Sequence, residues 1–566
     1  MNQPSPAIVQ QEAVRPLPRW VLWVLCGAYV LAGFMGRSPW KGEDIESFGH
    51  MLALAHPAPG QVAQWLHPAW MGQPDPQGAL LPYWLGAWVV SLLPGDGAFA
   101  AVRLPFMGLL ALTLWTLWHA AHALARHPGA APVSFAFGGE ARPRDYARTL
   151  ADGSVLALLA TLGLARAGHE TTPAVVQLCA QSLLLYGLAA LPVQRWTSLL
   201  ALCTGLLGLT LSGAPSVALA MGLWGLLVRA WPGGWPPTQR VRMLDLGLLA
   251  LTLLTCMVLA GSLQLWQWRI TGLESQRLLA DLRLLAWFTW PCGPLSLWAL
   301  WRWRHQLRQL WQHPHLSLPL GFMLITVSGA LLTAQGERAL ILALPSLATL
   351  TALALPTLSR SLGALIDWFT LVFFSLCGTV IWVVWLAMQT GWPASTAANV
   401  TRTAPGFVPG FSWLLLMPAL AVTLGWLVLV RWRTGRQRSA LWKSLILPAG
   451  GAVLCWSLLT SLWLPLLDYS RSYGPLVDKV RALTGPVDCV QIQGLNLAQG
   501  TALRYHAGWQ LQAAGEPSAH CAWLIRDHQS GLDEAWAARW DKVATLRRPS
   551  DKREDWILYR ARGPQP

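Results

Sequence analysis

Apolar stretches long enough to cross a membrane recur along most of this 566-residue chain. A transmembrane helix needs ~20 predominantly apolar residues. One such stretch would fit a signal peptide, but a dozen do not, so the pattern predicts a polytopic α-helical membrane protein. Only 12% of the residues are charged, against about 25% in soluble domains. The thirteen predicted spans cover residues 19–36, 100–123, 151–167, 173–191, 197–213, 215–231, 244–262, 284–302, 318–334, 340–357, 364–389, 411–432 and 444–466.

Basic residues cluster in four of the connections between these spans. The clusters lie in residues 126–148, 229–242, 302–308 and 431–443, and each follows an even-numbered span. The positive-inside rule therefore predicts a cytoplasmic N-terminus, and it places the first long loop and the C-terminal tail on the external side. The formal net charge of +15 is explained in the same way. No basic patch with interleaved aromatic residues appears, so no nucleic-acid partner is expected.

Two parts of the chain are too polar to cross the membrane. The first is the external loop 37–99, in which residues 43–55 and 80–93 have the pattern of amphipathic helices lying along a membrane surface. The second is the tail, residues 468–566, where predicted strands (VDCVQIQ, CAWLIRD, WILYRAR) alternate with predicted helices. This alternation predicts a small C-terminal α/β domain after a transmembrane domain of residues 1–467.

Two of the nine cysteines lie outside the apolar stretches. Cys489 and Cys521 each fall in or beside a predicted strand of the tail, and the external side of a bacterial inner membrane is oxidising. We therefore predict a disulfide between them, with two buried free thiols as the alternative. No CxxC spacing occurs, so a thiolate zinc site is not expected.

An acidic cluster stands directly after the first predicted span. Glu43, Asp44 and Glu46 crowd the stretch PWKGEDIESFGHM. A carboxylate at a membrane surface is partly desolvated, so its charge needs a cation, a hydrogen-bond donor or a function. One alternative is that Asp44 or Glu43 caps a helix beginning there. Another is a metal site that joins Asp44 to the histidines of the same loop, although their spacing matches no standard ligand pattern; these are His50, His56 and His67.

The stretch from Asp44 to Gly49 resembles a motif of known enzymes. Asp-Ile-Glu-Ser-Phe-Gly is similar to the Asp-Glu-x-x-Phe-Gly pattern in the first external loop of protein O-mannosyltransferases. It also resembles the Asp-Glu-x-x-Tyr stretch of the bacterial aminoarabinose transferases that modify lipid A. Both are GT-C-type glycosyltransferases that use a polyprenyl-phosphate sugar. This chain departs from the pattern where Ile45 replaces the family glutamate and Glu43 supplies an acid one residue before Asp44.

A second stretch, GALLPYWLGAWVVSLLPGDGAFAAVRLPFM, resembles the Pro-Pro-Leu-x-Tyr-Trp and Ala-x-Arg-Leu-Pro segments of the same families. Tyr83 and Arg103 occupy the corresponding positions. The families often carry Glu-Lys just before the prolines, and that lysine is thought to contact the donor phosphate. Gln77 and Gly78 stand there instead, so the resemblance leaves Lys41 or an external arginine for this contact.

Two further matches lie later in the chain. RAGHETTP, at the external junction of the third and fourth predicted spans, puts His169 and Glu170 where the families place an acid facing the active site. QGERALILALPSLA resembles the family pattern Lys-x-x-Arg-Tyr-x-x-x-x-x-Pro and puts Arg338 at the external end of a span. A guanidinium there would suit a phosphate, because its planar fork binds two oxygens at once.

The resemblance implies an inverting glycosyltransferase of the bacterial inner membrane. Asp44, with Glu43 beside it, would be the catalytic carboxylate, and substrates would contact Lys41, Tyr83, Arg103, His169, Glu170 and Arg338. The donor would be a polyprenyl-phosphate sugar, and the acceptor a lipid such as lipid A, a glycan or a protein. No cofactor is required by the motifs, and a divalent cation is left open. The alternatives are a transporter or flippase of lipid-linked sugars, and a glycan ligase or polymerase of similar architecture.

Overall fold

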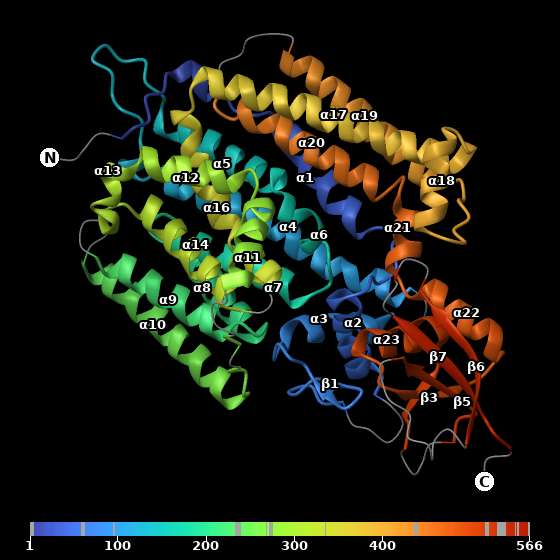
Figure 1. The fold of residues 1–566 in the computed structure, drawn as a ribbon. Coiled ribbons are helices and arrows are strands. Elements are labelled where there is room, and N and C mark those ends of the chain that lie inside the picture. The colour runs from blue at the N-terminus through green and yellow to red at the C-terminus, as the bar shows by residue number, and fades with distance from the viewer. Residues whose placement is uncertain are drawn as a thin grey trace.

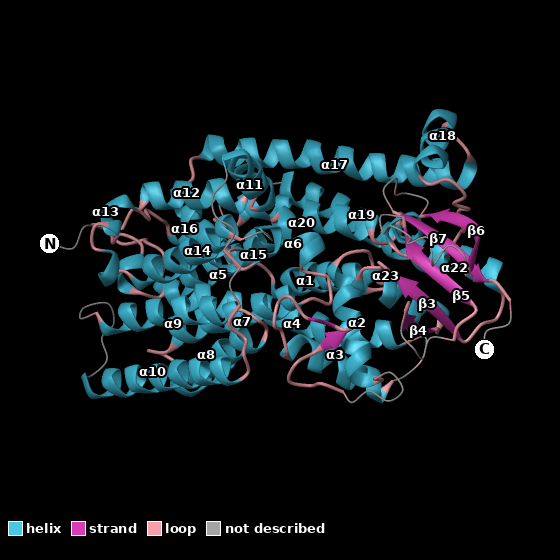
Figure 2. Cartoon of the chain, turned by 60° about the horizontal axis from the view of Figure 1, so that its bottom comes forward, coloured by secondary structure: helices cyan, strands magenta, loops and turns pink. Residues whose placement is uncertain are grey.

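A helical body carries a small sheet domain at one end, and the N-terminus lies at the other (Figure 1). The computed structural model describes residues 5–57, 63–93, 95, 97–231, 239–267, 269–270, 275–333, 336–434, 440–515, 520–528, 539–548, 551 and 554–563. After rotation, the long helices lie side by side and the five-stranded sheet is confined to the far end (Figure 2).

Every predicted span overlaps at least one helix of the body. These helices are α1 (Arg19–Phe34), α4 (Ala98–Ala125), α5 (Pro143–Ala160), α6 (Leu162–Ala167), α7 (Pro173–Ala190), α8 (Arg195–Leu211), α9 (Pro215–Ala230), α10 (Gln239–Ser262), α11 (Ser275–Phe288), α12 (Cys292–Arg302), α14 (Pro314–Leu332), α15 (Gly336–Ile341), α16 (Leu344–Ala354), α17 (Arg360–Thr390), α19 (Trp413–Thr434), α20 (Lys443–Leu459) and α21 (Leu464–Arg471). Two short helices, α13 (Arg304–Leu307) and α18 (Ala394–Thr403), lie in connections.

The polytopic membrane character is confirmed, whereas the count of thirteen spans is not. Among the described residues, six helices are each long and apolar enough to cross a membrane, and α20 with α21 makes a seventh if this pair, bent by 67°, counts as one span. Several predicted spans are broken: residues 284–302 divide between α11 and α12, and residues 340–357 between α15 and α16. Pro291 and Pro345 stand at the start of the second helix of these pairs, because proline is tolerated there and not in a helix interior.

The loop of residues 37–99 forms the two helices that its amphipathic pattern predicts. They are α2 (Glu43–Ala55) and α3 (Leu81–Leu92), and between them β1 (Ala69–Trp70) pairs with β2 (Gln73–Pro74). Gly42 precedes α2 with a φ of +111°, and it has no side chain with which to cap the helix. The alternative in which Asp44 or Glu43 caps α2 is therefore wrong. Both acids lie in the first turn, where the helix dipole favours negative charge.

The C-terminal domain is a five-stranded mixed sheet in the order β4-β3-β5-β7-β6. The strands are β3 (Cys489–Gln493), β4 (Gln510–Ala513), β5 (Trp523–Asp527), β6 (Trp540–Arg547) and β7 (Asp555–Ala561), with helices α22 (Gly474–Thr484) and α23 (Leu497–Ala502). Strand β3 is parallel to β4 and β5, and β7 is antiparallel to β5 and β6. The predicted small domain is confirmed; β4 and β6 were not predicted. The expected boundary at residues 467/468 falls inside α21.

The sheet domain docks on α2 and β1 through apolar and polar contacts. Ile45 is fully buried in the hydrophobic cluster that includes Tyr473, Leu476 and Trp556 of the tail. Trp70 Nε1 donates to Thr501 Oγ1 at 2.9 Å, and Arg504 donates to the carbonyl of His56. Ile45, which replaces the family glutamate, therefore belongs to the core of the C-terminal domain.

Cys489, at the start of β3, and Cys521, two residues before β5, are joined by a disulfide with a Cα–Cα distance of 5.6 Å. Strands β3 and β5 are direct neighbours in the sheet. The parallel register therefore brings the two cysteines into bridging distance, although 32 positions separate them in the sequence.

Candidate active site around Asp44

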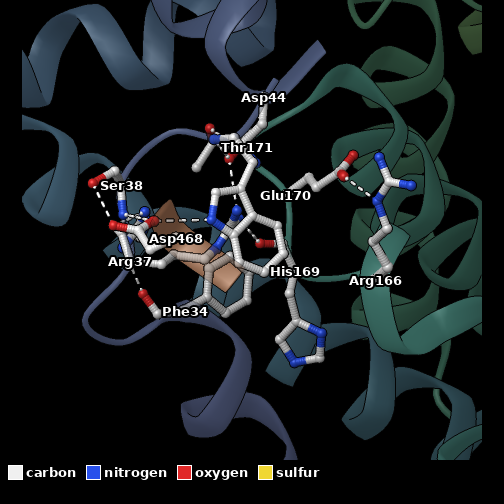
Figure 3. A network of polar contacts seen from close by, with 11 residues as sticks. Phe34, Arg37, Ser38, Asp44, Arg166, His169, Glu170, Thr171 and Asp468 are labelled. Carbon is white, nitrogen blue, oxygen red and sulfur yellow. Dashed lines mark hydrogen bonds and ion pairs between the residues drawn. The ribbon is translucent and has the colours of Figure 1, made fainter. Parts of the chain in front are cut away.

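The Asp44 carboxylate is buried and receives hydrogen bonds on both oxygens. Arg37 Nη1 lies 2.9 Å from Oδ2, which also accepts a 3.3 Å bond from the amide of Trp40. The amide and hydroxyl of Thr171 donate to Oδ1 at 2.8 and 2.9 Å. Figure 3 shows Asp44, Thr171 and Arg37 in one network of polar contacts. The loop of residues 37–99 and the α6–α7 connection thus meet at one carboxylate.

The environment of Asp44 keeps it ionised. Burial alone would raise the pKa of this carboxyl, but the charges of Arg37 and Arg103 and the bonds from Thr171 outweigh burial, so its pKa lies below the ordinary value. A carboxylate that accepts several hydrogen bonds and faces a guanidinium is a rigid negative charge. To accept a proton, one of its oxygens must first give up a donor.

Arg37 is held by the end of α1 and by its neighbours. Its Nη2 donates to the carbonyl of His169 at 2.7 Å, and its guanidinium lies 4.6 Å from the centre of the Trp40 ring. Arg103 donates to the carbonyl of Phe34 at 2.9 Å and to that of Arg37, so it satisfies carbonyls at the C-terminal end of α1. Helix ends need such partners. Arg103, predicted to contact substrate, is 3% exposed and supports the backbone beneath the site.

His169 is buried beneath the site rather than open to it. Its ring nitrogens lie 2.6 Å from the carbonyl of Ala165 and 2.9 Å from that of Tyr29. Burial lowers its pKa to about 4, although the two carbonyl contacts act in the opposite direction. A Cβ on Gly33 would come within 2.2 Å of this ring, so only glycine lets α1 approach so closely. The structure thus places this predicted substrate-binding residue in helix packing.

Glu170 lies next to the Asp44 network, and its pKa is shifted in the opposite direction from that of Asp44. Its Oε1 accepts a 3.2 Å bond from Arg166 Nε, as Figure 3 shows. Burial and then the negative charge of Asp44 raise the pKa of Glu170 to about 7. Two acids in one site therefore differ in their readiness to hold a proton, which is the usual arrangement where acid–base chemistry occurs.

Glu43 and Arg338, both predicted from the sequence, form an ion pair with each other. This contact joins the first turn of α2 to α15. Arg338 remains 30% exposed, while Glu43 Oε2 is buried without a hydrogen-bond partner. Burial lowers the pKa of Arg338 to about 10, which leaves it a cation. The pair joins Arg338 to the residue directly before Asp44 in the chain.

Lys41 faces the C-terminal domain. Its ammonium lies 2.8 Å from Asp551 and 2.7 Å from Glu554. Arg548 also pairs with Asp551, at 2.7 Å. Lys41, proposed from the resemblance as a substitute for the missing family lysine, therefore has two carboxylate partners that a phosphate would have to displace.

Tyr83 belongs to a second buried polar group, on α3 and the neighbouring turn of α2. Its ring stacks on that of His50, 4.9 Å away, and its hydroxyl is within hydrogen-bonding range of Asp75 and Ser47. Burial first, and then Asp75, raise the pKa of the Tyr83 hydroxyl, so it remains protonated.

Within the described residues, no three His, Cys, Asp or Glu side chains group as a metal site, so the site suggested for Asp44 with the loop histidines is not formed.

Sequence reasoning missed four residues of the site. Arg37 lies seven residues before Asp44, and Thr171 lies inside the matched stretch RAGHETTP. These positions were the signals from which the two residues could have been found. Asp468 had no such signal; it accepts bonds from Ser38 and from Trp40 Nε1 at 2.8–2.9 Å and ties the loop to α21. Arg471 is exposed, 5.4 Å from the Trp40 ring centre, and has no ion pair among the described residues.

The solved structure of ArnT from Cupriavidus metallidurans bound to undecaprenyl phosphate matches this chain with a TM-score of 0.59 at 14% identity, over 95% of this chain and 97% of that one. The chain has the ArnT fold. The apo form of ArnT matches over the same shares with a TM-score of 0.57, also at 14% identity. No protein-family model and no curated protein matches the sequence. The predicted resemblance to the aminoarabinose-transferase type is confirmed at the level of the fold, including the small C-terminal sheet domain.

Proposed function

We propose that this chain is a membrane glycosyltransferase that transfers a sugar from a polyprenyl-phosphate donor to a lipid, glycan or protein acceptor, with inversion at the anomeric carbon. The observation that carries the proposal is the ArnT fold over 95% of the chain, with the ArnT structure bound to undecaprenyl phosphate. The motif residues Asp44, Glu43, Glu170 and Arg338, which lie on separate segments, support it because they gather around one site.

Inversion follows from a single displacement. An acceptor oxygen forms a bond to the anomeric carbon from the face opposite the donor phosphate. The bond from that carbon to the phosphate oxygen breaks, and the polyprenyl phosphate leaves with the electron pair. Where the acceptor is a hydroxyl, its proton passes to a carboxylate. Asp44 is the proposed catalytic carboxylate, and Glu170 the alternative proton acceptor, because its pKa of about 7 suits a base at neutral pH.

The leaving phosphate needs cations rather than an acid, because its own pKa is low and its charge grows as the bond breaks. Arg338 is one proposed partner, since it is paired only with Glu43 in the described residues and is part-exposed. Arg471 is a second, since it is exposed beside Trp40 and near Arg166 and Glu170. Arg37 and Arg103 would act indirectly, by fixing Asp44 and the end of α1.

The proposed setting is the bacterial inner membrane, with the N-terminus cytoplasmic and the Asp44 site and sheet domain periplasmic. The four basic connections support this orientation. It places the site on the side where lipid-linked sugars meet acceptors outside the cytoplasm.

A direct test supplies the purified protein with polyprenyl-phosphate sugars and acceptor lipids in detergent, and follows the donor by mass spectrometry. The expected result is loss of the intact donor with release of free polyprenyl phosphate, abolished in an Asp44→Ala variant. A flippase would leave the donor chemically intact under the same conditions. Intact donor with every sugar and acceptor pair would contradict the proposal.

A further inference from the structure

A large cavity opens between α1, α4 and α5, and none of its wall residues belongs to the Asp44 site. It has a volume of about 590 Å³, and its walls are mostly apolar, including Leu22, Val30, Leu31 and Leu114. The cavity reaches along α1 from Arg19 to Leu31, about 18 Å at ~1.5 Å per residue. Half of a ~30 Å hydrocarbon core is one leaflet, so the cavity has the depth of a single leaflet.

The polar residues of this cavity gather at one end. Arg19 begins α1, Arg148 lies in the second turn of α5, and Asp152 lies near the middle of α5, where the charge of Arg19 and the amide of Leu17 act on it. His119 lies about two turns before the end of α4. Residues deeper in the three helices, such as Val30, are apolar. Because the Asp44 loop follows the opposite end of α1, this polar end faces the other surface of the membrane, which the positive-inside rule predicts to be cytoplasmic.

Asp152 is only partly satisfied within the protein. It is 4% exposed; its Oδ1 accepts a 2.8 Å bond from Trp118 Nε1, and its Oδ2 has no hydrogen-bond partner. The amide of Leu17 also faces this carboxylate. The charges of Arg148 and Arg19 act on this carboxylate, but neither side chain donates to Oδ2. A buried carboxylate oxygen without a donor is costly unless a ligand supplies one.

We propose that this cavity binds a phospholipid whose headgroup carries a phosphate and a protonated primary amine, that is, phosphatidylethanolamine. The two arginines bind the phosphate, the ammonium donates to Asp152 Oδ2, and one acyl chain fills the apolar part. Arginine suits phosphate because its fork binds two oxygens. A primary ammonium has three donors, whereas the quaternary ammonium of phosphatidylcholine has none and phosphatidylglycerol has no cation. Asp152 therefore favours the phospholipid with a primary ammonium, whereas the two arginines bind the phosphate of any of these phospholipids.

The test equilibrates the full-length protein in detergent micelles with equal amounts of phosphatidylethanolamine, phosphatidylglycerol and phosphatidylcholine, and weighs retained lipid by native mass spectrometry. Wild type should retain phosphatidylethanolamine preferentially. Asp152→Asn should lower that preference over phosphatidylglycerol by about tenfold, the loss of one charge-assisted bond. Arg148→Gln should lower the retention of phosphatidylethanolamine and of phosphatidylglycerol. Arg144→Gln, an equal loss of charge one turn earlier on α5 and outside the cavity wall, should change neither.

A cavity-filling variant keeps the proposal falsifiable if the charge variants fold poorly. A Cβ on Gly27 would meet nothing within 4 Å, and Gly27 lines the cavity, so Gly27→Phe should expel the acyl chain without disturbing packing. Gly108→Phe, equally free of neighbours and outside the cavity wall, is its control. If Gly27→Phe removes retention but Asp152→Asn leaves the lipid preference unchanged, the cavity holds an apolar chain alone, such as a polyprenyl tail, and the proposal is overturned. Equal retention of all three lipids by wild type would overturn it too.

Discussion

Thr171 donates two hydrogen bonds, of 2.8 and 2.9 Å, to Asp44, although the two residues are 127 positions apart in the chain. This contact joins the acidic stretch at the start of α2 to the turn that carries Glu170. With Arg37 on the other oxygen, it holds the Asp44 carboxylate ionised and in one orientation.

Replacing Asp44 with asparagine keeps the shape and removes the charge. We expect donor turnover to fall by about 10²–10⁴, the usual contribution of a general base. Because removing one partner of a buried pair costs about 3–5 kcal/mol, the variant should be assayed well below its measured melting temperature. Thr171→Val, which removes one hydrogen bond but keeps the carboxylate, should reduce turnover much less. Turnover of a folded Asp44→Asn within a few-fold of wild type would contradict the role.

The pH dependence separates Asp44 from Glu170. The raised pKa of Glu170, about 7, means that this acid is protonated below that pH and ionised above it. If Glu170 takes the proton, kcat/KM rises as the pH passes upward through about 7, and Glu170→Gln removes that limb. If Asp44 takes it, its lowered pKa puts the limb below the ordinary range of an aspartate, well away from that of Glu170. A limb near 7 that survives unchanged in Glu170→Gln would exclude Glu170 as the base.

Arg338 is expected to contact the donor phosphate. Arg338→Ala should raise the KM for donor by about tenfold or more, and Arg338→Lys should recover only part of it, because lysine keeps the charge and loses the fork. Glu43→Gln removes the ion-pair partner of Arg338 and should lower the donor KM, since the guanidinium is then free for phosphate. An unchanged donor KM in Arg338→Ala would reject the contact.

Ile45 should matter for the docking of the C-terminal domain. It is fully buried in the cluster of that domain, so Ile45→Ala should lower the free energy of unfolding by about 2–5 kcal/mol, and Ile45→Val by about 0.5–1.5 kcal/mol. Limited proteolysis should then cut Ile45→Ala faster than wild type between α21 and β3. Ile45→Glu, which restores the family residue, should be the most damaging of the three, because it buries an unpaired acid. Equal protease resistance in all variants would show that the domain docks without this contact.

The disulfide can be counted in the intact protein. Denaturing the chain without reductant and blocking its thiols should add seven groups, one for each cysteine outside the pair, and reduction first should add nine. Closing a loop of about thirty residues stabilises a domain by about 3–4 kcal/mol in the chain-entropy model, so Cys489→Ser with Cys521→Ser should lower the melting temperature. Nine added groups without reductant would mean that the bond does not form in the cell.

The sequence alone determined the helical membrane architecture, the amphipathic helices of the first loop and the presence of a small α/β tail. These properties are local, because apolar runs, amphipathic periodicity and alternating strands are written in neighbouring residues. The same is true of the motifs that singled out Asp44 and Glu170. The number of spans was not determined, because breaks such as those between α11 and α12, and the 67° bend after α20, depend on how helices pack.

Only the tertiary structure decided which charges pair. Arg37, Glu43 and Lys41 stand within seven residues of Asp44, yet their partners are, in turn, Asp44 itself, Arg338 and the acids of the tail. A salt bridge forms where two segments meet in space, and no local pattern in either segment states where the other will lie. The same limit hid Asp468, whose bonds to Ser38 and Trp40 join segments more than four hundred residues apart. The sequence therefore indicated which residue types carry the chemistry of the site, whereas helix packing determined which residues are in contact.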